Sequence, residues 1–488
     1  MSRATLAGKA RLSSVSSKVA GVTLANLAIT VLNIVAGVVV ARSFALADYG
    51  QLSYFVNVFG SLRLLGSLGL TSQVSFALAQ ARGRDEPYAA LFYQLLKLRV
   101  ATLGAVMLAL GGVGLARGDQ ALLLASGAAA VALLADFGIG ALQGLGRVRE
   151  VIAALLLQPV IYAAGLAPII AFGLPVQALY LLFAGSFLPP VLLAAVCLLR
   201  MAPPGAARGR ANISLGAALR FAGAMYGLAL CGTLFTSYAT LYLGALGKFA
   251  DTALITIPLN IIFMPGALLN MASSTVYFPR LSHAAAQRNS GEARALFQDF
   301  ASVAASAGLL VGANLLLYPR SLLYILYGAR YLASAELLAI LAIVAFAYPL
   351  QSVVTTTLAA QGRLRAALLY VGISTALLLV GVTLAVRYSA DLRLAAAAHA
   401  VAVVPVLVWQ LRTAGYPLRR LVASIGRSAL ALLVLGGAAR LCVPDAPEHL
   451  LAAIGALSAI TLLYTAWIWR WFYRAHALAE PPLGLRGN

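Results

Sequence analysis

Long apolar segments alternate with short polar ones along the whole chain. Fourteen of these segments contain about 20 residues or more, enough for an α-helix to cross a hydrocarbon core of about 30 Å. The pattern predicts spans at 19–41, 51–79, 90–115, 121–143, 151–173, 175–199, 215–246, 252–279, 297–318, 334–359, 366–387, 393–412, 421–442 and 449–470. The expected fold class is therefore all-α integral membrane, with about fourteen transmembrane helices.

Composition supports a membrane protein. The 488 residues are 62% hydrophobic and 10% charged, and the mean hydropathy is +0.92. Such a chain has little sequence left for a soluble domain. The longest polar linkers, 200–220 and 280–299, are basic and predict hinges between helix bundles.

The formal charge of +21 is explained mainly by topology. If there are fourteen spans, 26 basic residues lie on the side that both termini share, 8 lie on the other side, and Arg63 lies within a span. Because cytoplasmic loops carry an excess of Lys and Arg, both termini are expected in the cytoplasm. The inner charges would also attract anionic lipid headgroups, and nucleic-acid binding is not expected.

Motifs for chemistry are scarce. The sequence lacks the GxxxxGK[ST] loop that cradles ATP phosphates, and its His and Cys residues are too scattered to indicate a metal site or a disulfide framework. An intramembrane enzyme acting on a polyprenol sugar would use paired carboxylates. Only Asp136 lies clearly within a span, although the loop carboxylates Asp48, Asp119 and Asp391 leave catalysis open. We therefore expect neither an enzyme nor a bound cofactor.

An internal repeat organises the chain. In ALQGLGRVREVIAALL (141–156) and LAAQGRLRAALLYVGI (358–373), the motif GRVR (146–149) matches GRLR (362–365) at an offset of 216 residues. Each copy joins two spans, and an even number of spans per repeat preserves direction. This predicts two pseudo-symmetric six-helix lobes in parallel repeat, at 1–200 and 201–412, with two additional spans and a cytoplasmic tail at 413–488.

Arg63 is the one basic residue placed deep within a predicted span. A charge at the bilayer centre costs about 2.5–3.5 kcal/mol on insertion scales, so we expect it to face a watery cavity between the lobes. Two interpretations remain open: Arg63 recognises an anion, or it is a scaffold residue paired with Asp136 or with backbone carbonyls.

Ion coupling has two candidate locations. Asp136 is placed to carry a proton, or else it packs between helices. The eighth span contains Pro258 and Pro265 together with Asn260 and Asn270. Such a broken helix either coordinates a coupling ion or is merely kinked.

Four segments, taken in order, carry a resemblance to a known family: ADYGQLSYFVNVFGSLRLLGSLGL (47–70), ADTALITIPLNIIFMPGALLNMASSTVYFPRLS (250–282), LLYILYGARYLASAELLAILA (322–342) and LAAQGRLRAALLYVGISTALL (358–378). With these segments the sequence resembles the polysaccharide flippases of the Wzx type. That family belongs to the multidrug/oligosaccharidyl-lipid/polysaccharide exporter superfamily.

The resemblance implies a two-lobed transporter with a central cavity in the bacterial inner membrane. It would move an undecaprenyl-pyrophosphate-linked oligosaccharide from the cytoplasmic to the periplasmic leaflet by alternating access, for export of O-antigen, exopolysaccharide or capsule. Arg63 would hold the pyrophosphate, with Arg42 and Lys248 near the outer mouth. Its energy would come from an ion gradient, with H⁺ at Asp136 or Na⁺ near Asn260 and Asn270, from the membrane potential, or from pull by downstream polymerisation, and the sequence does not choose among them. A polysaccharide polymerase and export components would be its protein partners.

Three other functions are considered. A multidrug or cation antiporter of the same superfamily would favour an acidic cavity, which Arg63 argues against. A lipid II flippase has the same architecture, but its members usually place several arginines in the first spans. A membrane-embedded polysaccharide polymerase or ligase typically carries a large periplasmic loop, and no loop predicted here has that size.

Overall fold

The computed structural model describes residues 24–83, 88–118, 120–201, 215–272, 277–287, 290–389, 391–416 and 418–477. Within these ranges, twelve helices are long and apolar enough to cross a membrane. The second and third predicted spans are occupied by three more helices, α2 (Leu46–Ser67), α3 (Leu70–Gly83) and α4 (Tyr88–Arg117). The chain is a multi-pass, all-α membrane protein, and fourteen spans is an approximate count.

The chain divides into two compact units. The first comprises Met1–Thr233 and Leu243–Ala253, and the second comprises Leu234–Tyr242 and Leu254–Asn488. Helices α9 (Leu215–Ala245) and α10 (Phe249–Ala272) contribute to both units. The three-part division predicted above is based on sequence repetition and stays a prediction.

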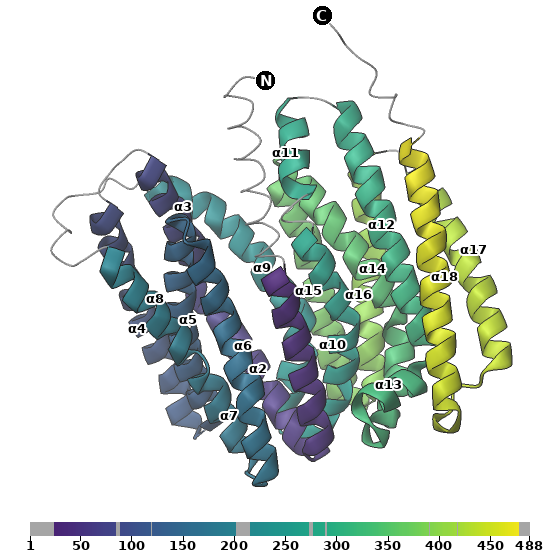
Figure 1. Ribbon diagram of the computed structural model, residues 1–488, viewed down its shortest axis with the longest axis horizontal. Coiled ribbons are helices and arrows are strands. Elements are labelled where there is room, and N and C mark those ends of the chain that lie inside the picture. Colours follow the sequence, from purple (N-terminus) through teal and green to yellow (C-terminus); the bar gives the residue numbers. More distant parts are fainter. Residues whose placement is uncertain are drawn as a thin grey trace, which may run out of the picture. The chain divides into compact units, whose positions relative to one another are not determined.

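Helix α5 (Gln120–Gly144) is the central helix of the first unit. It packs against α2, α3, α4, α6 (Val148–Ala171), α7 (Val176–Gly185) and α8 (Leu188–Met201) (Figure 1). Many of its buried residues are Ala or Gly. Small side chains let neighbouring membrane helices approach closely, which explains how one helix contacts six others.

In the second unit the central helix is α14 (Ala335–Ala360). It packs against α11 (Phe278–Ala286), α12 (Ser290–Leu317), α13 (Pro319–Tyr327), α15 (Leu364–Leu384) and α16 (Leu392–Thr413). Helices α17 (Arg419–Cys442) and α18 (Leu450–Ala477) lie side by side and both contact α12 (Figure 1). Short elements lie at η3 (Ala329–Ser334), η4 (Ala385–Ser389) and η5 (Pro447–His449).

The repeated motif forms the same turn after each central helix. Gly146 follows α5 with φ of 71°, and Gly362 follows α14 with φ of 75°, a left-handed conformation that glycine adopts without strain. In both turns the next backbone N–H bonds to a carbonyl oxygen five residues earlier, from Arg147 to Leu142 at 2.9 Å and from Arg363 to Leu358 at 2.8 Å. The sequence repeat is thus a structural repeat at these two turns.

One predicted hinge is mostly helical. Segment 280–299 lies largely in α11 and the start of α12, where Leu281 and Ala284 are fully buried. The prediction of a hinge was wrong because α11 is amphipathic. Its polar residues mask the helical pattern in the sequence, while its short apolar face packs on α12 and α14. In the other predicted hinge, residues 202–214 lie outside the described residues.

Candidate functional site

The second predicted span is two helices separated by a sharp break. Helix α2 ends at Ser67 and α3 begins at Leu70. Between them Leu68 has φ of 45° and Gly69 has φ of 71°. Such a φ is uncommon for leucine, and the last carbonyls of α2 lose their intrahelical partners at this point. A break of this kind within a membrane therefore needs donors from elsewhere in the protein.

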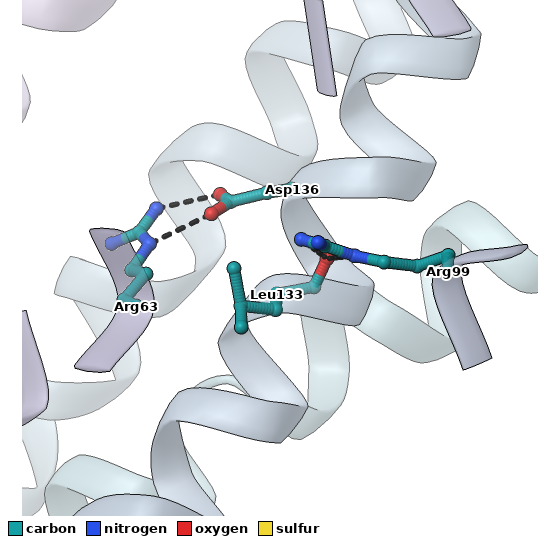
Figure 2. A network of polar contacts seen from close by, with 4 residues as sticks. All are labelled: Arg63, Arg99, Leu133 and Asp136. Carbon is teal, nitrogen blue, oxygen red and sulfur yellow. Dashed lines mark hydrogen bonds and ion pairs between the residues drawn. The ribbon is translucent and has the colours of Figure 1, made fainter. Parts of the chain in front are cut away.

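Arg99 of α4 supplies those donors. Its Nη1 donates hydrogen bonds to the carbonyl oxygens of Gly66 at 2.7 Å and Ser67 at 3.3 Å. Its Nε and Nη2 donate to the carbonyl oxygen of Leu133 in α5 at 3.3 and 3.1 Å (Figure 2). The side chain is fully buried. Arg99 therefore joins α4 to the end of α2 and to the central helix.

This role of Arg99 was not predicted from the sequence. The charge count assigned Arg99 to the inner loops, whereas it lies inside α4. Because Arg99 lies within the predicted span 90–115, its position could have indicated a role inside the membrane. The inner-side excess of basic residues therefore includes one arginine that serves packing and not topology.

Arg63 of α2 forms a two-pronged ion pair with Asp136 of α5. Arg63 Nε donates to Asp136 Oδ2 at 2.7 Å, and Nη2 donates to Oδ1 at 2.6 Å (Figure 2). The planar guanidinium fork matches the two carboxylate oxygens, and such paired, charge-assisted bonds are stronger than neutral ones. The pairing is the scaffold contact considered as one interpretation of Arg63.

The Arg63 side chain nevertheless stays accessible. It is 39% exposed, against 22% for Asp136, whereas Arg99 is fully buried. Its Cζ lies 6.0 Å from the ring centre of Phe59 and 5.7 Å from that of Phe187, distances suited to cation–π contact. Among the described residues, Nη1 has no hydrogen-bond partner. One edge of the guanidinium can therefore meet another anion.

The arrangement can exchange one anion for another. Arg63 and Arg99 carry two positive charges and Asp136 one negative charge, so these three side chains have a net positive charge. The guanidinium fork that binds the carboxylate also suits phosphate oxygens. A phosphate at Arg63 would compete with the Asp136 carboxylate for the guanidinium.

Lys248 and Arg42 lie away from the middle of α2. Lys248 is in the turn between α9 and α10, and its neighbour Phe249 packs against Gly50 of α2. Thirteen residues of helix separate Gly50 from Arg63, about 20 Å at 1.5 Å per residue. Arg42 is exposed near the end of helix Leu24–Ser43. The structure therefore does not bring Lys248 to Arg63, and substrate binding by Lys248 or Arg42 stays a prediction.

The predicted ion site of α10 is only partly described. Asn260 is exposed between Pro258 and Pro265, and the side chain of Asn270 lies outside the described residues. Among the described residues, no cluster of three His, Cys, Asp or Glu could hold a metal ion. A role for either asparagine in Na⁺ coupling stays a prediction.

No protein-family model and no curated protein matches this sequence. Solved structures do match. The structure of the lipid II flippase MurJ in an inward closed conformation aligns with a TM-score of 0.68 and 13% identity, covering 92% of this chain and 99% of that one. This chain has the fold of that transporter.

Multidrug transporters have the same fold. An inward-facing multidrug resistance MATE family transporter of the MOP superfamily aligns with a TM-score of 0.63 and 17% identity, over 80% of this chain and 98% of that one. A variant of the Vibrio cholerae MATE transporter VcmN aligns with a TM-score of 0.51 and 14% identity, over 83% and 96% of the two chains. Since flippases and drug transporters share this fold, the choice between them depends on the charged site.

Proposed function

We propose that this protein is a flippase that moves an undecaprenyl-pyrophosphate-linked oligosaccharide from the cytoplasmic to the periplasmic leaflet of the bacterial inner membrane. It would serve the export of a surface polysaccharide, with both termini in the cytoplasm. A polysaccharide polymerase and export components are its proposed partners, and anionic lipids would contact its basic loops. The fold, shared with transporters and with the lipid II flippase MurJ, supports transport and not catalysis.

The observation that carries the proposal is the accessible side chain of Arg63, in a segment that the sequence predicts to span the membrane. An arginine in the membrane is costly and marks a candidate functional site, and the partly exposed Arg63 would offer its guanidinium to an anion. The lipid-linked substrate would present two phosphates to the guanidinium, a geometry that the arginine fork suits.

Asp136 gives this site a release mechanism. In the empty transporter the carboxylate would occupy Arg63, as it does in the structure. Incoming pyrophosphate would displace it, and the freed carboxylate would take up a proton. Loss of that proton on the other side would restore the ion pair and expel the phosphate. H⁺ coupling through Asp136 is part of this proposal.

The second candidate is a cation or drug antiporter, and Asp136 is the observation that favours it. A membrane carboxylate binds cationic substrates, and the MATE transporters have the same fold. Against this candidate, both oxygens of Asp136 already accept hydrogen bonds from Arg63. A lipid II flippase is a further variant of the flippase proposal. Its substrate would also present phosphates to Arg63 and would differ in the sugar and peptide attached.

Transport in proteoliposomes tests the proposal. Purified protein would be reconstituted with a fluorescent undecaprenyl-pyrophosphate oligosaccharide, and movement between leaflets would be followed by quenching. We expect native protein to move the lipid, Arg63→Ala to lower the initial rate at least tenfold, and Arg63→Lys to retain part of it. Arg149→Ala is the matched control, because Arg149 is an exposed arginine at the start of α6.

Each contrary outcome is informative. Native protein that moves a cationic dye in exchange for protons, but not the lipid, would replace the flippase proposal with the antiporter. Equal lipid transport by native protein and Arg63→Ala would remove Arg63 from the site and leave it as a scaffold residue.

A further inference from the structure

A cavity lies at one end of the first unit, away from the Arg63–Asp136 ion pair. Its volume is about 380 Å³, within the range of ligand pockets. The walls come from the beginnings of α2, α5 and α7 and from the corner between α9 and α10. These helix ends line one cavity, so they lie together at one end of the first unit, the end of α5 opposite the Gly146 turn.

Two glycines create the wall on the α9–α10 side. A Cβ on Gly50 would lie 1.8 Å from the carbonyl oxygen of Phe249, and a Cβ on Gly244 would lie 2.3 Å from the ring of Tyr54. Only glycine allows contacts this close. The α9–α10 corner is therefore held against α2, and the Tyr54 ring is fixed at the cavity edge beside Phe249.

The polar lining of the cavity consists of neutral groups. Three glutamines and two tyrosines line the cavity: Gln51, Gln120, Gln177, Tyr54 and Tyr180. Phe249 and small or aliphatic residues complete the lining. No charged side chain occurs in the described lining. The Tyr180 ring is buried and stacks on Phe55 at 4.5 Å, so it is rigid.

This lining suits a carbohydrate. A side-chain amide has both donors and an acceptor, which match the hydroxyls of a sugar, and aromatic rings offer apolar faces to the sugar's C–H groups. No described residue hydrogen-bonds to the side chains of Gln51, Gln120 or Gln177. The described lining offers no counter-charge to an anionic or cationic ligand.

We propose that this cavity binds an uncharged sugar unit, and this inference rests on the proposed flippase function. Gln51 and Arg63 lie on the same helix, about 18 Å apart along its axis. A lipid-linked glycan whose pyrophosphate is at Arg63 would therefore extend along α2 toward the cavity. The cavity would select the glycan while the arginine selects the phosphate.

Binding without transport tests the inference. The protein in lipid nanodiscs would be mixed with the methyl glycosides of glucose, galactose, mannose, N-acetylglucosamine and glucuronic acid, and contacts would be read by saturation-transfer NMR. We expect at least one neutral glycoside to give signal and the charged glucuronide to give less than a third of it. The combined Gln51→Leu, Gln120→Leu and Gln177→Leu variant should lose the signal at least fivefold.

Two further variants guard against misfolding. Ala121→Trp fills the cavity from another wall and leaves the three amides in place, so it should also abolish the signal. Gln287→Leu, an exposed glutamine outside the cavity, should bind like native protein. Binding that survives both cavity variants, or that favours the glucuronide, would overturn the inference, as would a lack of signal from all four neutral probes.

The result is independent of the transport assay. Sugar binding that is lost in the cavity variants, in a protein that moves no lipid, would keep the cavity assignment and reject the flippase. Lipid transport that requires Arg63, without any sugar binding, would support the flippase and reject the cavity assignment.

Discussion

At the residue scale, two arginines in neighbouring apolar helices have opposite roles. Arg63 is accessible and pairs with a carboxylate, while Arg99 is buried and binds backbone carbonyls. Sequence alone singled out Arg63 and offered Asp136 as a partner, because charges within apolar runs are conspicuous. It could not find the partners of Arg99, since carbonyl groups have no sequence signature.

Reversing the ion pair should separate its structural from its functional role. We expect Arg63→Ala and Asp136→Ala each to lower the free energy of unfolding. The loss should be less than the roughly 3–5 kcal/mol for removing one partner of a fully buried pair, because Arg63 is partly exposed. The swap Arg63→Asp with Asp136→Arg should recover stability but not lipid transport, since the cation moves to another helix. Thermal unfolding in detergent and the transport assay measure the two effects. Full transport by the swapped protein would show that charge position does not matter.

Loss of Arg99 should destabilise the protein strongly. Arg99→Met keeps much of the volume but leaves the carbonyls of Gly66, Ser67 and Leu133 without these donors. Hydrogen bonds to a charged group contribute about 1.5–3 kcal/mol each, so a large fall in melting temperature is expected. Lys97→Met is the control, because Lys97 is exposed on the same helix. Equal melting temperatures for both variants would contradict the assigned role.

At the scale of elements, hydrophobic pattern located most helices but not the break between α2 and α3. The run 51–79 is mostly apolar and predicted one span. The break at Leu68 and Gly69 is sustained by Arg99, which is distant in sequence, so a local pattern could not reveal it. Close approaches were equally hidden, because the glycines that permit them look like any other glycine in an apolar helix.

The contact between α2 and the α9–α10 corner should be sensitive to a single methyl group. Gly50→Ala places a Cβ against the backbone of Phe249, and overpacking of this kind costs about 1–3 kcal/mol. Gly60→Ala, in the same helix with open space around it, should be neutral or stabilise by up to about 1 kcal/mol. Chemical or thermal unfolding of both variants measures the change in stability. If Gly50→Ala and Gly60→Ala have the same effect, α2 does not pack tightly against the α9–α10 corner.

At the scale of the whole molecule, the sequence repeat marks equivalent places in the two units. Gly146 and Gly362 follow α5 and α14, each the helix around which its unit packs. The repeat could be predicted because the left-handed turn demands glycine and so leaves a sequence trace. The central position of the two helices could not be predicted, because burial by neighbouring helices and burial by lipid favour the same apolar residues.

The repeat and the charge pattern together predict membrane topology. In a variant whose three cysteines are replaced, Arg149→Cys and Arg363→Cys should react with an impermeant maleimide only from the cytoplasm. Leu174→Cys and Leu246→Cys, exposed at the opposite helix ends, should react from the periplasm. Labelling of intact and opened cells measures this. Arg149→Cys and Arg363→Cys on different sides would refute a parallel repeat.

The carbonyl contacts of Arg99 have a consequence for biosynthesis. Helices α2 and α3 leave the ribosome before α4, and Leu133 of α5 follows only later. Until α5 is made, Arg99 lacks one of its three carbonyl partners, and an arginine with unmet hydrogen-bond donors in the membrane is unfavourable. The first four helices would therefore remain beside the insertion machinery and enter the bilayer as a group. A nascent chain stopped before residue 120 should stay extractable by alkaline carbonate, whereas one stopped after residue 145 should not.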